Sequence, residues 1–119
     1  MRKTTNGFTV ASHFENRDLV VKLIYDQLVK KLRKFGSICE EPKKTSIHLV
    51  NTTAFAGVAT RMNSIIMTIK SDRQISNTRI HKSQQTSARR FHHEVRLTSP
   101  AEIDAELLAW LRNAYELSA

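Results

Sequence analysis

Apolar residues recur every three or four positions near the start of the chain, in the stretch RDLVVKLIYDQLVKKLRKF. This spacing predicts an amphipathic α-helix that runs from about Arg17 to Phe35. Asn16 or Asp18 is the expected N-cap, and Gly36 follows the last turn as a C-terminal stop signal. The apolar stripe of this helix is predicted to consist of Leu19 or Val20, Leu23, Ile24, Leu28 and Leu32.

Alternation of apolar and polar residues begins after the turn EEPKK, in which Pro42 disfavours a helical conformation of the preceding residue. The alternation predicts β-strands over residues 45–50, 53–60 and 64–70. Because the connections between them are short, these strands are expected to pair antiparallel. In the strand over residues 64–70, Ile65, Met67 and Ile69 lie on one face and Ile66 lies on the other. Because both faces of this strand carry apolar residues, we expect it near the centre of the sheet.

The stretch from Phe91 to Thr98 also alternates and predicts a further strand. One face of this strand carries Phe91, His93, Val95 and Leu97, and the other carries His92, Glu94, Arg96 and Thr98.

A capping box follows this strand directly, in the sequence SPAE. Ser99 is the expected N-cap, Pro100 occupies the first helical position, and Glu102 lies three residues after the cap. The box predicts a final helix from Pro100 to about Leu117. Its buried face is expected to contain Ile103, Leu107, Leu111 and Ala114 or Tyr115.

Residues 71–90 show no clear period. A short strand around residues 74–76 or 79–81 is one interpretation, and a polar, basic loop is the other. Loops on a rigid scaffold often carry binding residues, so this segment is a candidate for function. Its basic and titratable side chains are Arg73, Arg79, His81, Lys82, Arg89 and Arg90.

Together these elements predict a single α+β domain. The chain has 119 residues, 40% of them hydrophobic, which suits one domain with a modest core. We expect an N-terminal helix, an antiparallel sheet of about four or five strands and a C-terminal helix, with both helices packed on one face. The domain is placed at residues 14–119, after a flexible N-terminal segment of residues 1–13.

Cysteine use and hydropathy favour a soluble protein of a reducing compartment. Cys39 is the only cysteine, which excludes an internal disulfide and a two-cysteine metal site. A membrane span needs a run of about 18 apolar residues, and the sequence has none. The apolar residues near the N-terminus are too few for a secretory signal. We therefore expect a cytoplasmic protein with no membrane association.

The charge of the chain suggests an anionic partner. The formal net charge is +8 and the pI is about 10.1. Lysine and arginine side chains can contact phosphates without reading bases, so nucleic acid or another polyanion is the predicted partner. Solubilising charge without a specific partner is the alternative. The predicted anion-binding residues are Lys43, Lys44, Arg61, Lys70, Arg73, Arg79, Lys82, Arg89 and Arg90.

Histidines supply the remaining candidates for chemistry. His93 falls on an apolar strand face, so we expect a neutral, buried imidazole with two hydrogen-bond partners; a role in a pocket is the alternative. His48 and Arg96 are further pocket candidates. His92 and Glu94 share a face and are candidate metal ligands, with His48 or His81 as a third. No recognised metal-binding or nucleophile motif accompanies them, so we predict no metal and no cofactor.

The segments EEPKKTSIHLV, FAGV and RFHHEVRLTSPAEIDAELLAWLRNAYELS resemble a family of small bacterial domains of unknown function. Some members form the C-terminal part of larger proteins labelled as predicted transport proteins. The resemblance extends from Phe14 to nearly the end of the chain, and it implies no catalytic residues. More loosely, the order of elements is similar to that of small α+β domains of the YdhG and YjbR type.

Three functions therefore stand as predictions. The leading one is a non-enzymatic binding module with a basic surface for nucleic acid or another anionic ligand. The second is a small metal-dependent hydrolase or nuclease that uses His92, Glu94 and His48. The third is a protein-interaction domain whose charge is incidental, with an exposed apolar patch that includes Trp110 and with self-association as one form of partnership.

Overall fold

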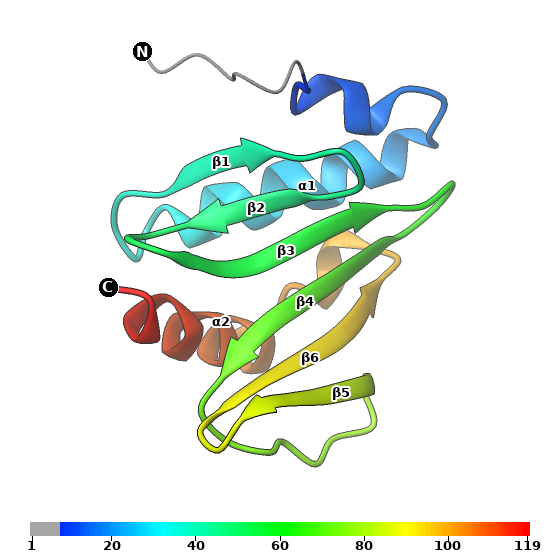
Figure 1. Ribbon diagram of the computed structural model, residues 1–119. Coiled ribbons are helices and arrows are strands. Elements are labelled where there is room, and N and C mark those ends of the chain that lie inside the picture. Colours follow the sequence, from blue (N-terminus) through cyan, green and yellow to red (C-terminus); the bar gives the residue numbers. More distant parts are fainter. Residues whose placement is uncertain (1–7) are drawn as a thin grey trace.

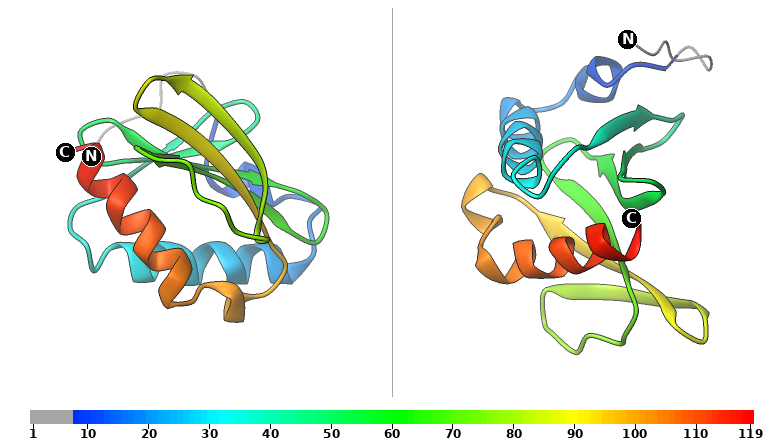
Figure 2. Two further views of the ribbon diagram at one scale, coloured as in Figure 1. Left: turned by 90° about the horizontal axis from the view of Figure 1, so that it is seen from below. Right: turned by 90° about the vertical axis from the view of Figure 1, so that its left-hand side faces the viewer.

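Two α-helices cover one face of a six-stranded antiparallel sheet, and no α-helix of residues 8–119 lies on the opposite face (Figures 1 and 2). The computed structural model describes residues 8–119. The strand order across the sheet is β1-β2-β3-β4-β6-β5. The elements are η1 (Ala11–Phe14), α1 (Leu19–Leu32), β1 (Cys39–Pro42), β2 (Ile47–Val50), β3 (Ala54–Thr60), β4 (Ile65–Ser71), β5 (Ile80–Ser87), β6 (Arg90–Leu97), η2 (Pro100–Glu102) and α2 (Ala105–Leu117).

The predicted α+β class is confirmed, but the expected count of four or five strands is wrong. One additional strand is β1, which pairs antiparallel with β2 where a turn was expected. Pro42 is compatible with β1 because it ends a strand at the sheet edge, where its missing N–H costs little. The other is β5, which overlaps the short strand that one interpretation placed around residues 79–81 but extends to Ser87, and whose residues after Ile80 are exposed and polar. No apolar alternation marks such an edge strand.

The buried face of α1 differs from the predicted stripe. Leu19 and Leu23 are 84% and 56% exposed. The buried residues of the helix are Val21, Ile24, Tyr25, Leu28, Val29 and Leu32. Apolar residues surround much of this helix, so its period alone does not determine which side meets the sheet. Asp18 is the N-cap by backbone position, although its side chain makes no capping hydrogen bond.

The capping box after β6 is confirmed, but it caps a short 3-10 turn. The hydroxyl of Ser99 accepts a hydrogen bond from the backbone N–H of Ala101, and the Glu102 carboxylate accepts one from the N–H of Ser99. The chain then leaves helical geometry at Ile103. Asp104 starts α2 by accepting a hydrogen bond from the N–H of Leu107. The final helix therefore begins after Asp104 and not at the predicted proline.

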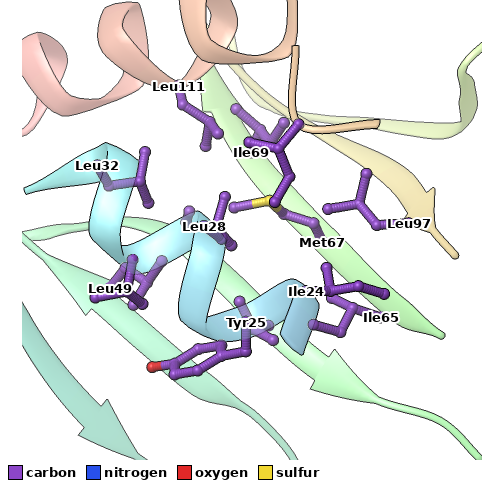
Figure 3. Close-up of a cluster of buried hydrophobic side chains, with 14 of the residues drawn as sticks. Ile24, Tyr25, Leu28, Leu32, Leu49, Ile65, Met67, Ile69, Leu97 and Leu111 are labelled. Carbon is purple, nitrogen blue, oxygen red and sulfur yellow. The ribbon is translucent and has the colours of Figure 1, made fainter. Parts of the chain in front are cut away.

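The core lies between the sheet and the two helices (Figure 3). Strand β4 pairs with β3 and β6, and its side chains Ile65, Met67 and Ile69 face the core. Leu28 of α1 and Leu111 of α2 lie in the same cluster and are fully buried. Alternation along β4 consequently places Ile66, Thr68 and Lys70 on the uncovered face.

The N-terminal part of the chain was expected to be flexible over residues 1–13. Residues 1–7 lie outside the described residues, and η1 covers the end of the segment. The ring Nε2 of His13 hydrogen bonds to the carbonyl oxygen of Lys43 at 2.8 Å. Among residues 8–119, no helix is long and apolar enough to cross a membrane.

Two substitutions on α1 test the face that is buried. Leu28→Ala removes a fully buried side chain and should lower the free energy of unfolding by about 2–5 kcal/mol. Leu23→Ala truncates an exposed side chain of the same type and should change it by less than about 0.5 kcal/mol. Urea denaturation measures both. An equal loss in the free energy of unfolding of both variants would contradict the orientation of α1.

Candidate anion-binding site on the uncovered sheet face

Four strands contribute side chains to the middle of the uncovered face. In the register of the sheet, Gly57 of β3 lies between His48 of β2 and Thr68 of β4. Two residues after Thr68 in β4, Lys70 pairs with His92 of β6. Residues two apart on a strand share a face, so these side chains project to the side away from the helices.

A β-bulge in β3 shapes the floor of this region. Leu49 pairs with Ala56 while Val50 pairs with Ala54, so Phe55 is an extra residue in β3. Both Phe55 and Ala56 are buried, and the Phe55 ring packs edge-on against Tyr115 at 5.3 Å. The bulge leaves only small residues of β3 on the uncovered face, namely Ala54, Gly57 and Ala59.

The small floor creates a hollow of about 270 Å³. Its walls include Ser46, His48, Thr68, Lys70 and His92. A Cβ atom placed on Gly57 would lie 4.0 Å from Cδ2 of His48, so the imidazole stands beside the glycine at van der Waals distance. The volume is at the lower end of ligand pockets, which suits a small molecule or one unit of a chain.

Lys70 is held at one end of the hollow. Its ammonium donates hydrogen bonds to the hydroxyl of Ser118 at 2.9 Å and to that of Thr53 at 3.4 Å. Burial lowers the pKa of Lys70, and the positive charge of Arg90 lowers it further. Among residues 8–119, neither cation forms an ion pair with a carboxylate. An anion bound here would relieve the repulsion between the two.

His48 has a pKa below its ordinary value because it is partly buried and, second, because Lys43 is close. The carboxylate of Glu41 acts in the opposite direction. Partial burial therefore favours the neutral imidazole, whose flat ring is available for stacking.

The nine predicted anion-binding residues do not form one surface. Lys70 and Arg90 come together, but Lys43, Lys44 and Arg61 lie in turns at the other end of the strands. Arg73 pairs with Asp72 at 3.0 Å. Lys82 and Arg89 are exposed on and beside β5. Anion binding by each of these residues stays a prediction.

Arg79 already has several partners within the protein. It pairs with Asp104 at 2.8 Å and Glu106 at 3.3 Å, and it donates to the carbonyl oxygen of Glu102. Its guanidinium also lies over the ring of Trp110, 5.9 Å from the centroid. These contacts join the loop before β5 to the start of α2, so Arg79 is first of all a structural residue.

His93 lies on the covered side of the sheet and is 1% exposed. Its Nε2 is 3.0 Å from the carbonyl oxygen of Arg73, which can only accept, so Nε2 carries a proton. Its Nδ1 is 2.8 Å from the hydroxyl of Ser83. Both ring nitrogens thus have partners, as expected for a buried imidazole, and His93 does not line the hollow.

The metal candidates are only partly brought together. His92 lines the hollow, while the Glu94 carboxylate lies 3.5 Å from Nε2 of His81 across the β5–β6 pair. In the part of the chain that the structure describes, no three side chains of His, Cys, Asp or Glu are close enough to hold a metal ion. Arg96 is exposed beside Ile66 and also lies outside the hollow.

Sequence reasoning missed the small residues that form the floor. The segment TAFAGVAT contains the signal, because Ala54, Gly57 and Ala59 are too small to cover a sheet face. Simple alternation would place Ala54 and Ala56 on one side and Gly57 on the other. Only the bulge at Phe55 puts Ala54 and Gly57 on the same face.

Comparison with known families identifies the domain family but no activity. The profile of the domain of unknown function DUF5655 matches residues 10–118. The chain belongs to this family. The predicted resemblance to an uncharacterised domain family is thereby confirmed. No curated protein and no solved structure shows significant similarity to the chain. The hollow of this DUF5655 domain must therefore be interpreted from its own chemistry.

The pKa of His48 in this DUF5655 domain provides a test of the site's electrostatics. An NMR titration should place it below the ordinary value of 6.5. Lys43→Gln should raise the pKa, because it removes a nearby positive charge. Because folding lowers the pKa of His48, the contribution of this residue to the free energy of unfolding is complete above its pKa in the unfolded state. That contribution is lost as the pH falls through its pKa in the folded state.

Lys44→Gln is the matched control for that titration, since it removes the neighbouring charge, which is not among the causes of the lowered pKa of His48. An equal effect of both substitutions, or a His48 pKa above 6.5 in the unsubstituted protein, would contradict the described environment.

Proposed function

We propose that this domain is a non-enzymatic binding module that takes an anionic ligand against the uncovered face of the sheet. The observation that carries the proposal is the β4–β6 register, which pairs Lys70 with His92 and so places Arg90, two residues along β6, on the same face. Lys70 lines one end of the hollow with the small floor, and neither cation has a carboxylate partner among residues 8–119. Paired cations of this kind favour a phosphate group, whose oxygens accept several hydrogen bonds.

Single-stranded nucleic acid is the ligand class that this face fits best. A phosphate at Lys70 and Arg90 would leave the attached base close to the hollow, which His48 and His92 border. Histidine rings stack on bases, and a floor of alanine and glycine admits a flat ring without displacing a side chain. A duplex keeps its bases inside the helix, so it would contact the cations but not enter the hollow.

An interaction domain is the second candidate, and one observation favours it. Leu19, Leu23 and Met62 are exposed apolar side chains. They are close in the fold, since the N–H of Asp18 donates to the carbonyl oxygen of Met62. Trp110, which was expected in such a patch, is half-buried beneath Arg79.

Fluorescence anisotropy with labelled single-stranded and duplex DNA and RNA tests the binding proposal. Lys70→Gln/Arg90→Gln should weaken single-strand binding by about tenfold or more, since it removes two charge-assisted contacts. It should also reduce the slope of log affinity against log salt by about 0.7, because the two cations contact one phosphate of a single strand.

Lys30→Gln/Lys34→Gln is the matched control, because it removes the same charge from exposed positions in and just after α1. Binding should survive this change almost intact. An equal loss in both double variants would show that only net charge matters. Absence of binding at low salt, where electrostatic attraction is strongest, would refute the nucleic-acid proposal.

A single substitution tests whether the hollow itself is used. Gly57→Leu adds bulk that projects from the floor toward the space beside His48, and nothing but that ring lies within contact distance of the new Cβ. We expect the thermal midpoint to change little and single-strand affinity to fall by about tenfold, as for one lost base stack. Gly57→Ala should have a smaller effect. Unchanged affinity of Gly57→Leu would place the ligand elsewhere.

A further inference from the structure

We infer that a second site, which binds a phosphate group, lies at the opposite end of β3 and is formed by Arg17, Lys44 and Arg61. These residues come from three segments of the chain, namely the link between η1 and α1, the β1–β2 turn and the residue after β3. They line a hollow of about 340 Å³. This site is independent of the function proposed above, because it shares no residue with the hollow beside Lys70.

Thr60 positions both guanidinium groups of this site. Its hydroxyl accepts a hydrogen bond from Nε of Arg17 at 3.2 Å and donates one to the carbonyl oxygen of His13 at 2.6 Å. Its own carbonyl oxygen accepts from Nη1 of Arg61 at 3.2 Å. Thr60 is 6% exposed, so this anchor is buried while the arginines remain accessible. Each guanidinium uses one nitrogen here and keeps its other N–H donors for a ligand.

The charge around the hollow is unbalanced. Among the described residues, Arg17, Lys44 and Arg61 form no ion pair, and no carboxylate lines the hollow. Glu15 and Asp18 flank Arg17 in the sequence but do not line the hollow. The three cations therefore attract an anion without a competing carboxylate in the hollow.

The donors that remain free identify the ligand. Ser12 already donates its hydroxyl proton to the carbonyl oxygen of Thr9, and Thr60 donates to His13. What remains is two guanidinium forks, one ammonium and the hydroxyl of Thr45. A carboxylate can occupy one fork, whereas a phosphate has enough oxygens to meet both forks and the ammonium together. Inorganic phosphate and the phosphate of an ester are the two sources of this chemistry.

Isothermal titration calorimetry with inorganic phosphate, at constant ionic strength and in the Lys70→Gln/Arg90→Gln variant that disables the first site, tests the inference. Arg17→Gln/Arg61→Gln should weaken phosphate binding by about tenfold or more. Because Arg17 also contacts Thr60, Lys44→Gln provides a second variant. The Lys44 side chain is exposed and makes no hydrogen bond within residues 8–119, and its loss should weaken phosphate binding by several fold, up to about tenfold. The control Lys30→Gln/Lys34→Gln removes two exposed cations in and just after α1, which line neither hollow, and should leave phosphate binding unchanged.

The source of the phosphate is distinguished in the Lys70→Gln/Arg90→Gln background, where the first site is disabled. Tighter binding of a 5′-phosphorylated oligonucleotide than of its 5′-hydroxyl counterpart, lost with Lys44→Gln, would identify a chain end. Binding of inorganic phosphate alone would identify a small ligand, and either result supports the site. No binding up to about 10 mM phosphate, or equal weakening by the Lys30/Lys34 control, would overturn it whatever the outcome at Lys70.

Discussion

The packing of α1 and α2 against the same face of the sheet is the constraint on which the rest of the structure depends (Figure 2). It gives every central strand a covered side and an uncovered side. In β4 the covered side carries Met67 at the centre of the core, and the uncovered side carries Thr68 and Lys70. Residues on the uncovered side are not needed to fill the interior. They are therefore available for binding, and the candidate site lies among them.

The bulge at Phe55 modifies this division at one position. It turns two successive residues of β3 inward, so that Phe55 reaches Tyr115 of α2. The same change brings Ala54 and Gly57 to the uncovered face, where larger side chains would fill the hollow. One local irregularity thus contributes both to the attachment of α2 and to the shape of the candidate site.

The distribution of carboxylates explains which cations are available. Asp104 and Glu106 are engaged by Arg79, Glu40 by Arg33 and Asp72 by Arg73. A hydrogen bond from the backbone of Leu107 and the charge of Arg79 keep the pKa of Asp104 low, so this carboxylate stays ionised. Among the cations of residues 8–119 that form no ion pair, two groups lie at the two ends of β3, namely Lys70 with Arg90 and the set of Arg17, Lys44 and Arg61.

The sequence by itself determined the features that depend on local order along the chain. Alternation defined the strands of the core, and Ser99 to Glu102 formed the expected capping box, because both depend on neighbours a few residues apart. Tertiary structure alone decided which side of α1 is buried and that the strand beginning at Ile80 extends to Ser87 at the sheet edge. It also decided that Lys70 lies near Arg90 while Arg79 is engaged by Asp104. The physical reason is that these outcomes depend on contacts between residues distant in the chain, and a local pattern of polar and apolar residues does not reveal such contacts.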